Sequence, residues 1–363
     1  MKNFSSIAIV IAIVMCSFLS ANAQKIQVVD TDGLPIAHVC VTNEKGVLIG
    51  STDNDGWLED AKGAQVLNLS HIAFQDIAVR LVDITGGRIV MENVDYVLPN
   101  VEVKPKELAY VQTYFRLIYI DEDGPLYYRG GVIDNTYEFA NHKTSSKTRS
   151  LSKGESGLLR FLISTLVGRY IDKLGQITEN PTYQKLLEYE KKGDVTLVAE
   201  PSGRITVSDS VCVLGYIDTD TVAHTRTTSF NNRKFMEHRK AAEDKAKGKK
   251  SKEKNVKERD ETYYEVYRID EDGRSRSDDF MMRQWQISTV HSHSNTKYMI
   301  LLQAYATDYN YIDKKEYKQL RKENKVDMNI HELRQFEKAH NIPVLAPDIQ
   351  AAVDKLFEKE LKK

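Results

Sequence analysis

Apolar and polar residues alternate through the first part of the chain, as far as about residue 103. The period is two, which places successive side chains on opposite faces of a strand. The alternation is clearest at residues 38–41, 67–69, 77–79 and 89–91. Turn-forming stretches such as Asp32-Gly33-Leu34-Pro35 and residues 52–56 separate these runs. Many short strands at regular spacing predict an all-β sandwich or barrel.

Beyond a linker at Lys104-Pro105-Lys106, helical and strand periods are mixed. Helical spacing predicts helices at 108–118, 157–174, 181–192, 311–323, 329–340 and 347–361. Strand-like runs lie at 126–129, 132–139, 195–199, 205–217, 221–230, 263–269, 285–293 and 298–305. The polar stretch 142–153 is expected to be a loop. Helices that flank a block of strands predict an α+β domain with an antiparallel sheet over residues 104–363.

A charged stretch at 231–261 interrupts the strands and holds very few apolar residues. It cannot bury enough surface to offset the entropy of ordering, so we expect a flexible insertion. Two interpretations remain: a basic arm for an anionic partner, or a solvated, partly helical insertion in a hairpin. The acids interspersed among its lysines and arginines favour the second.

The first 23 residues have the layout of a secretory signal peptide. Lys2 precedes an apolar run at 7–19, and Ala21 and Ala23 occupy the −3 and −1 positions of a cut before Gln24. The run is shorter than the roughly 20 apolar residues that span a bilayer. Residues 1–23 are therefore expected to be removed, and no later segment is apolar enough to cross a membrane.

Several motifs in residues 24–103 resemble one known family. Gly33-Leu34-Pro35-Ile36 followed by Val39-Cys40-Val41, then residues 50–58, 67–74 and 98–103, match its strands and its most diagnostic turn. The family is the carboxypeptidase regulatory-like domain, a transthyretin-like (prealbumin-like) β-sandwich found at the N-terminus of envelope proteins of Bacteroidota. Ile26, His38 and Ala73 stand where this family usually has glycine. The resemblance implies an accessory fold without peptidase activity.

Composition adds few constraints. Lys and Arg number 51 and Asp and Glu 52, so we expect no nucleic-acid partner. Of 3 cysteines, Cys40 and Cys212 remain after the leader, and a disulfide between them is possible in an oxidising compartment. Their positions in different predicted units favour two separate thiols.

His291 and His293 are the candidate metal ligands. Residues i and i+2 of a strand point to the same face, so both imidazoles could reach one ion, with His224 or an aspartate as third ligand. The alternative is a pair of solvent-facing histidines. Three Asp-rich stretches, at 51–62, 121–124 and 270–273, lack the calcium-loop ligands and are predicted hairpin turns.

Nucleophile motifs are poor. Gly154-Glu155-Ser156-Gly157 is one residue short of a nucleophile elbow, and Cys212 has no cationic neighbour in the sequence. We therefore expect a non-catalytic exported protein, periplasmic or outer-membrane associated, that needs no cofactor. It would bind or scaffold an envelope protein or a glycan. The alternatives are a glycan-binding protein, which would use some of 19 Tyr with Trp57 and Trp285, and a metal-assisted hydrolase at His291 and His293.

Overall fold

The computed structural model describes most of the chain after the predicted leader. The described residues are 25–59, 61, 63–94, 96, 106–155, 175–178, 181–247, 256–291, 296–323 and 326–357. The leader prediction and the helix predicted at 157–174 lie outside them.

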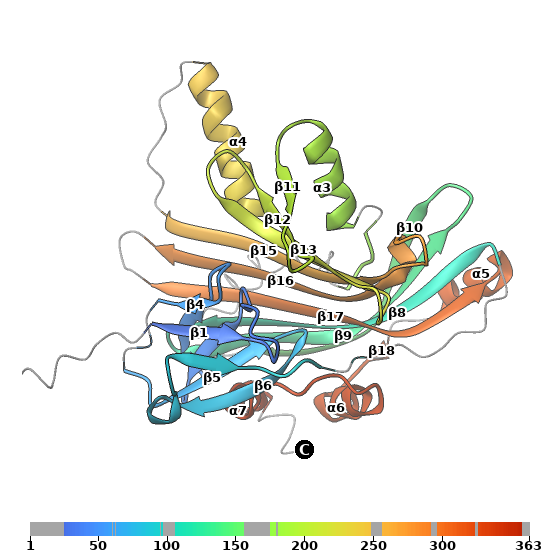
Figure 1. The fold of residues 1–363 in the computed structure, drawn as a ribbon. Coiled ribbons are helices and arrows are strands. Elements are labelled where there is room, and N and C mark those ends of the chain that lie inside the picture. Colours follow the sequence, from blue (N-terminus) through green and yellow to red (C-terminus); the bar gives the residue numbers. More distant parts are fainter. Residues whose placement is uncertain are drawn as a thin grey trace, which may run out of the picture.

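The N-terminal unit consists of two β-sheets (Figure 1). The first has the order β4-β1-β7, with β1 (Ile26–Val29), β4 (Trp57–Leu58) and β7 (Arg88–Val90). The second has the order β3-β2-β5-β6, with β2 (Cys40–Asn43), β3 (Leu48–Ser51), β5 (Val66–His71) and β6 (Phe74–Arg80), which a 3-10 helix (Leu81–Asp83) follows.

Apolar side chains from both sheets share one core. Its buried members include Ile26, Val28, Val41, Leu58, Leu67, Leu69 and Phe74. Gly56 holds the predicted turn at 52–56 at φ 74, and a Cβ there would lie 2.5 Å from the Val28 carbonyl oxygen, so only glycine fits. The prediction of β-sandwich architecture is confirmed at this level, and the transthyretin-like assignment stays a proposal.

The second unit is built on one sheet of eleven strands. Its order is β11-β12-β13-β14-β15-β16-β17-β8-β9-β10-β18, antiparallel except for the β10–β18 pair. The strands are β8 (Leu108–Asp121), β9 (Gly124–Glu138), β10 (Lys143–Glu155), β11 (Thr196–Ala199), β12 (Ile205–Ser208), β13 (Val213–Asp220), β14 (Thr225–Asn231), β15 (Val256–Arg268), β16 (Phe280–His291), β17 (Lys297–Ile312) and β18 (Val326–Asp327).

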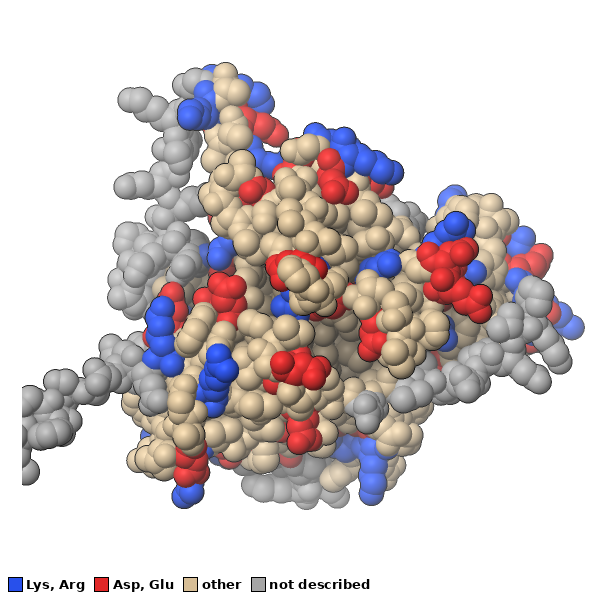
Figure 2. All heavy atoms as spheres, viewed as in Figure 1, with Lys and Arg blue, Asp and Glu red and all other residues tan. Residues whose placement is uncertain are grey.

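Helices cover both faces of this sheet (Figure 1). They are α3 (Thr182–Lys191), α4 (Asn232–Ala246), α5 (Lys314–Lys322), α6 (Ile330–Ala339) and α7 (Pro347–Leu356). We call the face that carries Tyr114, Arg116 and Gln284 the sandwich face, because it packs against the N-terminal unit, α6 and α7. The α3 face carries Phe115 and Arg283. Figure 2 shows acidic and basic side chains intermixed on the side in view.

Two predictions in this unit were wrong. The helix expected at 108–118 is strand β8, whose residues are buried on both faces. A strand without a solvent face lacks polar alternation, so Leu108, Val111, Phe115 and Ile118 mimic helical spacing. The loop expected at 142–153 is strand β10, which is polar because it lies near the sheet edge beside the two-residue β18.

The described residues of the predicted insertion, 231–247 and 256–261, are also more ordered than predicted. Residues 232–246 form α4, and residues 256–261 belong to β15. Asn231 caps the helix by accepting from the Lys234 backbone N–H at 2.9 Å, and Phe235 is fully buried. One buried aromatic is enough to dock a helix that is otherwise charged, so the partly helical interpretation is confirmed for these residues.

Other predicted elements are confirmed. The helices expected at 181–192, 329–340 and 347–361 correspond to α3, α6 and α7. Ile349, Val353 and Phe357 form the buried stripe of the last. No described helix is long and apolar enough to cross a membrane.

A line of buried hydrogen bonds joins the two units. The Arg116 Nε donates to Gln303 Oε1 at 2.7 Å, and Gln303 Nε2 donates to Gln284 Oε1 at 3.0 Å. The same Gln284 oxygen accepts the Ile72 backbone N–H of the sandwich at 3.1 Å. Arg116 also donates to the Pro343 carbonyl oxygen at 2.7 Å. The line therefore fixes both the sandwich and the chain that enters α7 to one face of the sheet.

Two histidines are buried at this junction. His38 stands at φ 61, in the left-handed backbone region that favours glycine. His71 packs edge-on against Tyr264 of β15, with ring centroids 4.5 Å apart. Burial lowers the pKa of His38 to about 4 and that of His71 to about 3, whereas burial raises the pKa of Asp76 to about 6.

These shifts predict that acid loosens the junction. Between pH 6.5 and about 4, His38 and His71 each bind a proton in the unfolded chain but stay neutral in the folded chain. The folded chain binds one at Asp76 that the unfolded chain does not. For these three groups together, the excess of about one proton on the unfolded state contributes a loss of about 1.4 kcal/mol in the free energy of unfolding for each pH unit of acidification. Asp279, whose pKa burial also raises to about 6, acts in the opposite direction.

Urea unfolding at several pH values measures this slope. The His71→Phe variant removes one of the two histidine protons, so its slope should be smaller than that of the wild type by about 1.4 kcal/mol for each pH unit. His224→Ala, at an exposed position, is the control. Equal slopes for the wild type and His71→Phe would contradict the prediction.

Candidate functional site

A cavity of about 580 Å³ lies on the α3 face of the large sheet. This volume is within the range of roughly 300–1,000 Å³ that is usual for small-molecule sites. The described residues that line it are Thr144, Gln176, Ile177, Thr178, Thr182, Lys185, Leu186, Tyr189, Phe230, Asn232, Tyr263, Glu265, Arg283, Trp285 and Leu302. The wall is therefore part apolar and part charged.

The apolar part is a row of cross-strand neighbours. Phe230 pairs with Tyr263, Tyr263 with Trp285, and Trp285 with Leu302, so four adjacent strands present one side chain each. The rings of Tyr263 and Trp285 stack with an interplanar angle of 15° and centroids 5.4 Å apart. Strand register thus creates a continuous hydrophobic floor from residues far apart in the sequence.

The charged part is the next row along the same strands. Glu265 of β15 lies directly opposite Arg283 of β16 in the ladder. The Arg283 Nε donates to Glu265 Oε1 at 2.7 Å, and the two side chains are 6% and 3% exposed. Burial acts to raise the pKa of Glu265, but Arg283 and the Thr182 backbone N–H hold it below its usual value.

Arg283 has more N–H groups than its hydrogen bonds to the described residues use. Its Nη1 donates to the Gln176 carbonyl oxygen at 2.8 Å and its Nη2 to the Tyr267 hydroxyl at 3.3 Å. An arginine carries five N–H groups, and the bonds to Glu265, Gln176 and Tyr267 use three of them. The other two have no partner among the described residues, although the side chain is buried on the cavity wall. A ligand oxygen would satisfy them.

The segment 175–178 forms one side of the cavity. Asn135 and Thr113 both donate to the Gly175 carbonyl oxygen, at 2.9 and 2.5 Å. The Asn135 Oδ1 accepts the Ile177 N–H at 3.3 Å. These buried contacts aim the Gln176 carbonyl at Arg283. Gly175, at φ 63, is packed so closely that a Cβ would lie 2.9 Å from the Thr113 hydroxyl.

Helix α3 forms the opposite side. Its first residue, Thr182, donates its backbone N–H to Glu265 Oε2 at 2.9 Å, so the helix N-terminus is tied to the ion pair. Leu186 is buried against the apolar floor and Lys185 is exposed at the rim. The entrance therefore carries a positive charge above an apolar interior.

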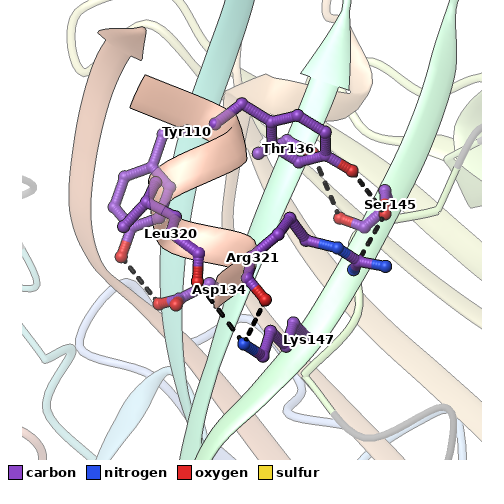
Figure 3. Close-up of a pocket in the computed structure, with 8 residues that line it drawn as sticks. Tyr110, Asp134, Thr136, Ser145, Lys147, Leu320 and Arg321 are labelled. Atoms are coloured by element: carbon purple, nitrogen blue, oxygen red, sulfur yellow. Dashed lines mark hydrogen bonds between the residues drawn. The ribbon is translucent and has the colours of Figure 1, made fainter. Parts of the chain in front are cut away.

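A second, smaller pocket lies where α5 packs on the sheet (Figure 3). It lies between β8, β9, β10 and α5 and holds about 10 Å³, roughly the space of one water molecule. The Tyr110 hydroxyl donates to Asp134 Oδ1 at 2.7 Å, and Lys147 donates to the Arg321 carbonyl oxygen at 2.8 Å and to that of Glu323. Lys147 thus caps the C-terminus of α5, and the pocket fastens this helix to the sheet.

The predicted metal ligands do not form a site among the described residues. His291 ends β16, and its side chain and all of His293 lie outside the described part of the chain. His224 lies beside Ile269, beyond the far end of β15, whereas His291 pairs with Val256 at the near end. Twelve residues of strand separate the two ends, about 40 Å when extended. His224 is therefore excluded as the third ligand, and the pair itself stays a prediction.

Other candidates have definite places. Cys40 is buried, Cys212 is partly exposed, and both thiols are free, as the interpretation of separate cysteines predicted. The Asp-rich stretches form turns: Asp121 pairs with Gly124 at the β8–β9 hairpin, and the Gly273 N–H donates to the Asp270 carbonyl oxygen. Ser156 of the incomplete elbow lies outside the described residues.

Sequence reasoning missed Glu265 and Arg283, although a signal was present. Each is the lone charge in a strand segment that is otherwise mostly apolar or aromatic, 263–267 and 280–285. A charge at a position that the alternation assigns to the interior needs a partner. Two such charges of opposite sign on neighbouring strands could have been paired before the structure was known.

Comparisons with known proteins place the chain in no family. No protein-family model and no curated protein matches the sequence. One similar solved structure concerns lipid-protein interactions in lipovitellin, with 7% sequence identity and a TM-score of 0.26. The match covers 56% of this chain and 25% of the lipovitellin chain. A likeness at this level carries no argument, so the cavity has to be interpreted from its own chemistry.

The ion pair predicts a non-additive stability change. Arg283→Met leaves the buried Glu265 without its cation and should lower the free energy of unfolding by about 3–5 kcal/mol. Replacing both residues, as Glu265→Leu with Arg283→Met, should cost much less, because no charge is left unpaired.

Urea denaturation of the two single variants and the double variant measures the coupling. Arg80→Met, in the exposed pair with Asp83, is the control and should leave unfolding nearly unchanged. Strictly additive effects of the two replacements would show that the pair is not coupled.

Proposed function

We propose that this chain is an exported cell-envelope protein that binds an amphipathic small molecule in the cavity on the α3 face. The ligand has an apolar body and an acidic head, and no chemical reaction is carried out on it. The N-terminal sandwich acts as the scaffold or docking module that the family resemblance implies.

The proposal depends on one observation: an apolar row and a charged row of side chains lie next to each other on one wall of the cavity. The two N–H groups that Arg283 keeps in reserve match the oxygens of a carboxylate or a phosphate. The neighbouring floor of Phe230, Trp285 and Leu302 matches an apolar chain or ring. Lys185 at the rim adds positive charge, so the cavity as a whole favours an anion over a cation.

The lining favours binding over catalysis. The described lining residues include no cysteine, serine or histidine, and Glu265 is committed to Arg283 and Thr182. A carboxylate that is already paired and hydrogen-bonded is a poor general base. The described lining therefore favours recognition, because its one carboxylate is committed to the ion pair and it includes no cysteine, serine or histidine.

A glycan ligand is the alternative. Sugar rings stack on exposed aromatic faces, but Trp285 is 6% exposed and stacks on Tyr263. Of 19 tyrosines, 12 are buried in the described core: Tyr96, Tyr110, Tyr114, Tyr119, Tyr127, Tyr128, Tyr137, Tyr216, Tyr264, Tyr267, Tyr305 and Tyr309. These buried rings are not available to stack on a sugar, which weighs against the glycan alternative.

Tryptophan fluorescence tests the ligand class directly. The chain has Trp57 and Trp285 only, so Trp57→Phe leaves one reporter inside the cavity wall. Titration with palmitate should give a saturable change in Trp285 emission. Hexadecanol, which has the same chain without the charge, should bind at least about tenfold more weakly, because a hydrogen bond to a charged group contributes about 1.5–3 kcal/mol.

Variants connect that signal to the cavity. Leu302→Phe fills the floor and Arg283→Lys keeps the charge but loses the planar array of donors, and both should weaken palmitate binding. Val198→Phe makes a similar enlargement at an exposed position on β11 and should have no effect. Circular dichroism confirms that each variant is folded. Saturable binding of an oligosaccharide without palmitate binding would favour the glycan alternative, and no saturable change with any probe would remove the cavity as a binding site.

Export is tested by the mature N-terminus. When the full-length chain is expressed in a Gram-negative host, intact-mass analysis should find a protein in the envelope fraction that begins at Gln24. Ala23→Pro, at the −1 position, should block cleavage, whereas Lys25→Ala should not. A full-length chain that stays in the cytoplasm would contradict the proposal.

A further inference from the structure

Three potential metal ligands converge where α4 meets the β12–β13 hairpin. Asp209, Cys212 and His238 each bring one ligand atom, and these atoms all lie within 4.8 Å of one another. Asp209 and Cys212 belong to the hairpin turn, and His238 to α4. The group is separate from the cavity lining, although Cys212 packs against the same apolar cluster as Leu186 and Phe230.

The hairpin turn holds two of the ligands in place. The Asp209 Oδ1 accepts the backbone N–H groups of Val211 and Cys212 at 2.8 and 2.9 Å, and the Asp209 N–H donates to the Cys212 carbonyl oxygen at 3.1 Å. These bonds use only one carboxylate oxygen. The other, Oδ2, is directed at His238 and lies 2.6 Å from its Nδ1.

The third ligand is held by the packing of α4. Phe235, three residues before His238, is fully buried against Leu214, Phe230 and Tyr189. Residues three apart on a helix lie on the same side, so this anchor turns His238 toward the hairpin. The His238 side chain is 28% exposed and that of Asp209 is 6% exposed. An ion could therefore enter from solvent beside His238 and be bound on its buried side by Asp209.

We propose that Asp209, Cys212 and His238 bind a zinc ion, with the fourth position open to water. Ligand atoms bound to zinc at about 2.0–2.3 Å in a tetrahedron lie roughly 3.3–3.8 Å from one another. The three ligand atoms lie within 4.8 Å of one another, so shifts of about 1 Å suffice, including a lengthening of the 2.6 Å His238–Asp209 contact. Thiolate, imidazole and carboxylate together suit zinc better than calcium or magnesium, which prefer oxygen ligands.

The protons balance in this step. Burial, and then the negative charge of Asp209, raise the pKa of the Cys212 thiol, so the metal-free sulfur carries its proton. Zinc binding forms the S–Zn bond and releases that proton to solvent. Lys234 and Asp260 act on the same thiol with opposite charges.

The open fourth position differs from the closed four-ligand set of a structural zinc, but the ion would still cross-link two elements of the fold. It would join α4 to the β12–β13 hairpin, two elements that the packing of Phe235 and the His238–Asp209 hydrogen bond also link. The next residue along the strand, Val213, accepts a hydrogen bond at 3.0 Å from Asn54 in the Asp-rich turn of the sandwich. Zinc at the hairpin would therefore brace the surface against which the sandwich turn lies.

Cobalt substitution reports on the thiolate directly. A mature chain with Co²⁺ in place of Zn²⁺ should show a near-ultraviolet charge-transfer band, because such a band requires a cysteine sulfur on the metal. The band should saturate at one ion per chain and disappear when Zn²⁺ is added. Cys212→Ser should abolish the band, and His238→Gln should weaken cobalt binding by tenfold or more, whereas His224→Ala, at an exposed histidine, should leave it unchanged.

Alkylation is an independent readout that does not depend on colour. Cys40 is fully buried, so iodoacetamide should label only Cys212 in the folded chain. Stoichiometric Zn²⁺ should slow this labelling by tenfold or more in the wild type, and much less in His238→Gln.

The outcomes separate the alternatives. No charge-transfer band and no zinc protection of Cys212 would overturn the proposal and leave the three residues as a hydrogen-bonded turn. Zinc binding that persists in Cys212→Ser but is lost in the His291→Ala, His293→Ala double variant would overturn it as well and would place the ion at the histidine pair.

Discussion

Two buried arginines, one on each face of the large sheet, hold the molecule together and give it a site. A sheet that is covered on both sides has to satisfy every polar group it buries. On the sandwich face, Arg116 bonds to Gln303 and to the Pro343 carbonyl oxygen, and this line continues through Gln284 into the sandwich. On the α3 face, Arg283 bonds to Glu265 and Gln176 but keeps two donors for the cavity. The first arginine fixes the arrangement of the units, and the second leaves an interaction for a ligand to complete.

Sequence reasoning succeeded where local physical chemistry decides the structure. The turns at 52–56 and 121–124 follow from Gly and Asp, and α7 follows from Pro347 and its apolar stripe. It failed where tertiary contacts decide. Strand β8 is buried on both faces, so its apolar spacing carries no information about its period. Strand β10 has polar side chains that find partners, such as Asp134 for Arg149, only in the folded chain.

The candidate sites, too, combine features that the local sequence indicates with features that only tertiary contacts create. Glu265 and Arg283 could have been found as lone charges in apolar strands, but the cavity they line depends on the register of four strands and on the placement of α3. The sequence alone does not bring His238 to Cys212, since His238 lies on a helix 26 positions later. Contacts of this kind are set by the docking of α4, which in turn depends on the burial of Phe235.

The order of strands in the large sheet has a consequence for how the chain folds. Strand β8 begins the second unit, yet it lies between β9 and the last long strand, β17, with Leu108 opposite Ile312. The hairpins β8–β9–β10 and β11 to β16 can each form from neighbouring sequence, but the seam between them closes only when β17 arrives. Closing so long a loop is slow, and until it closes β8 has an exposed apolar edge open to mispairing. A chain that stops short of residue 297 would therefore be expected to aggregate rather than to form a smaller version of this fold.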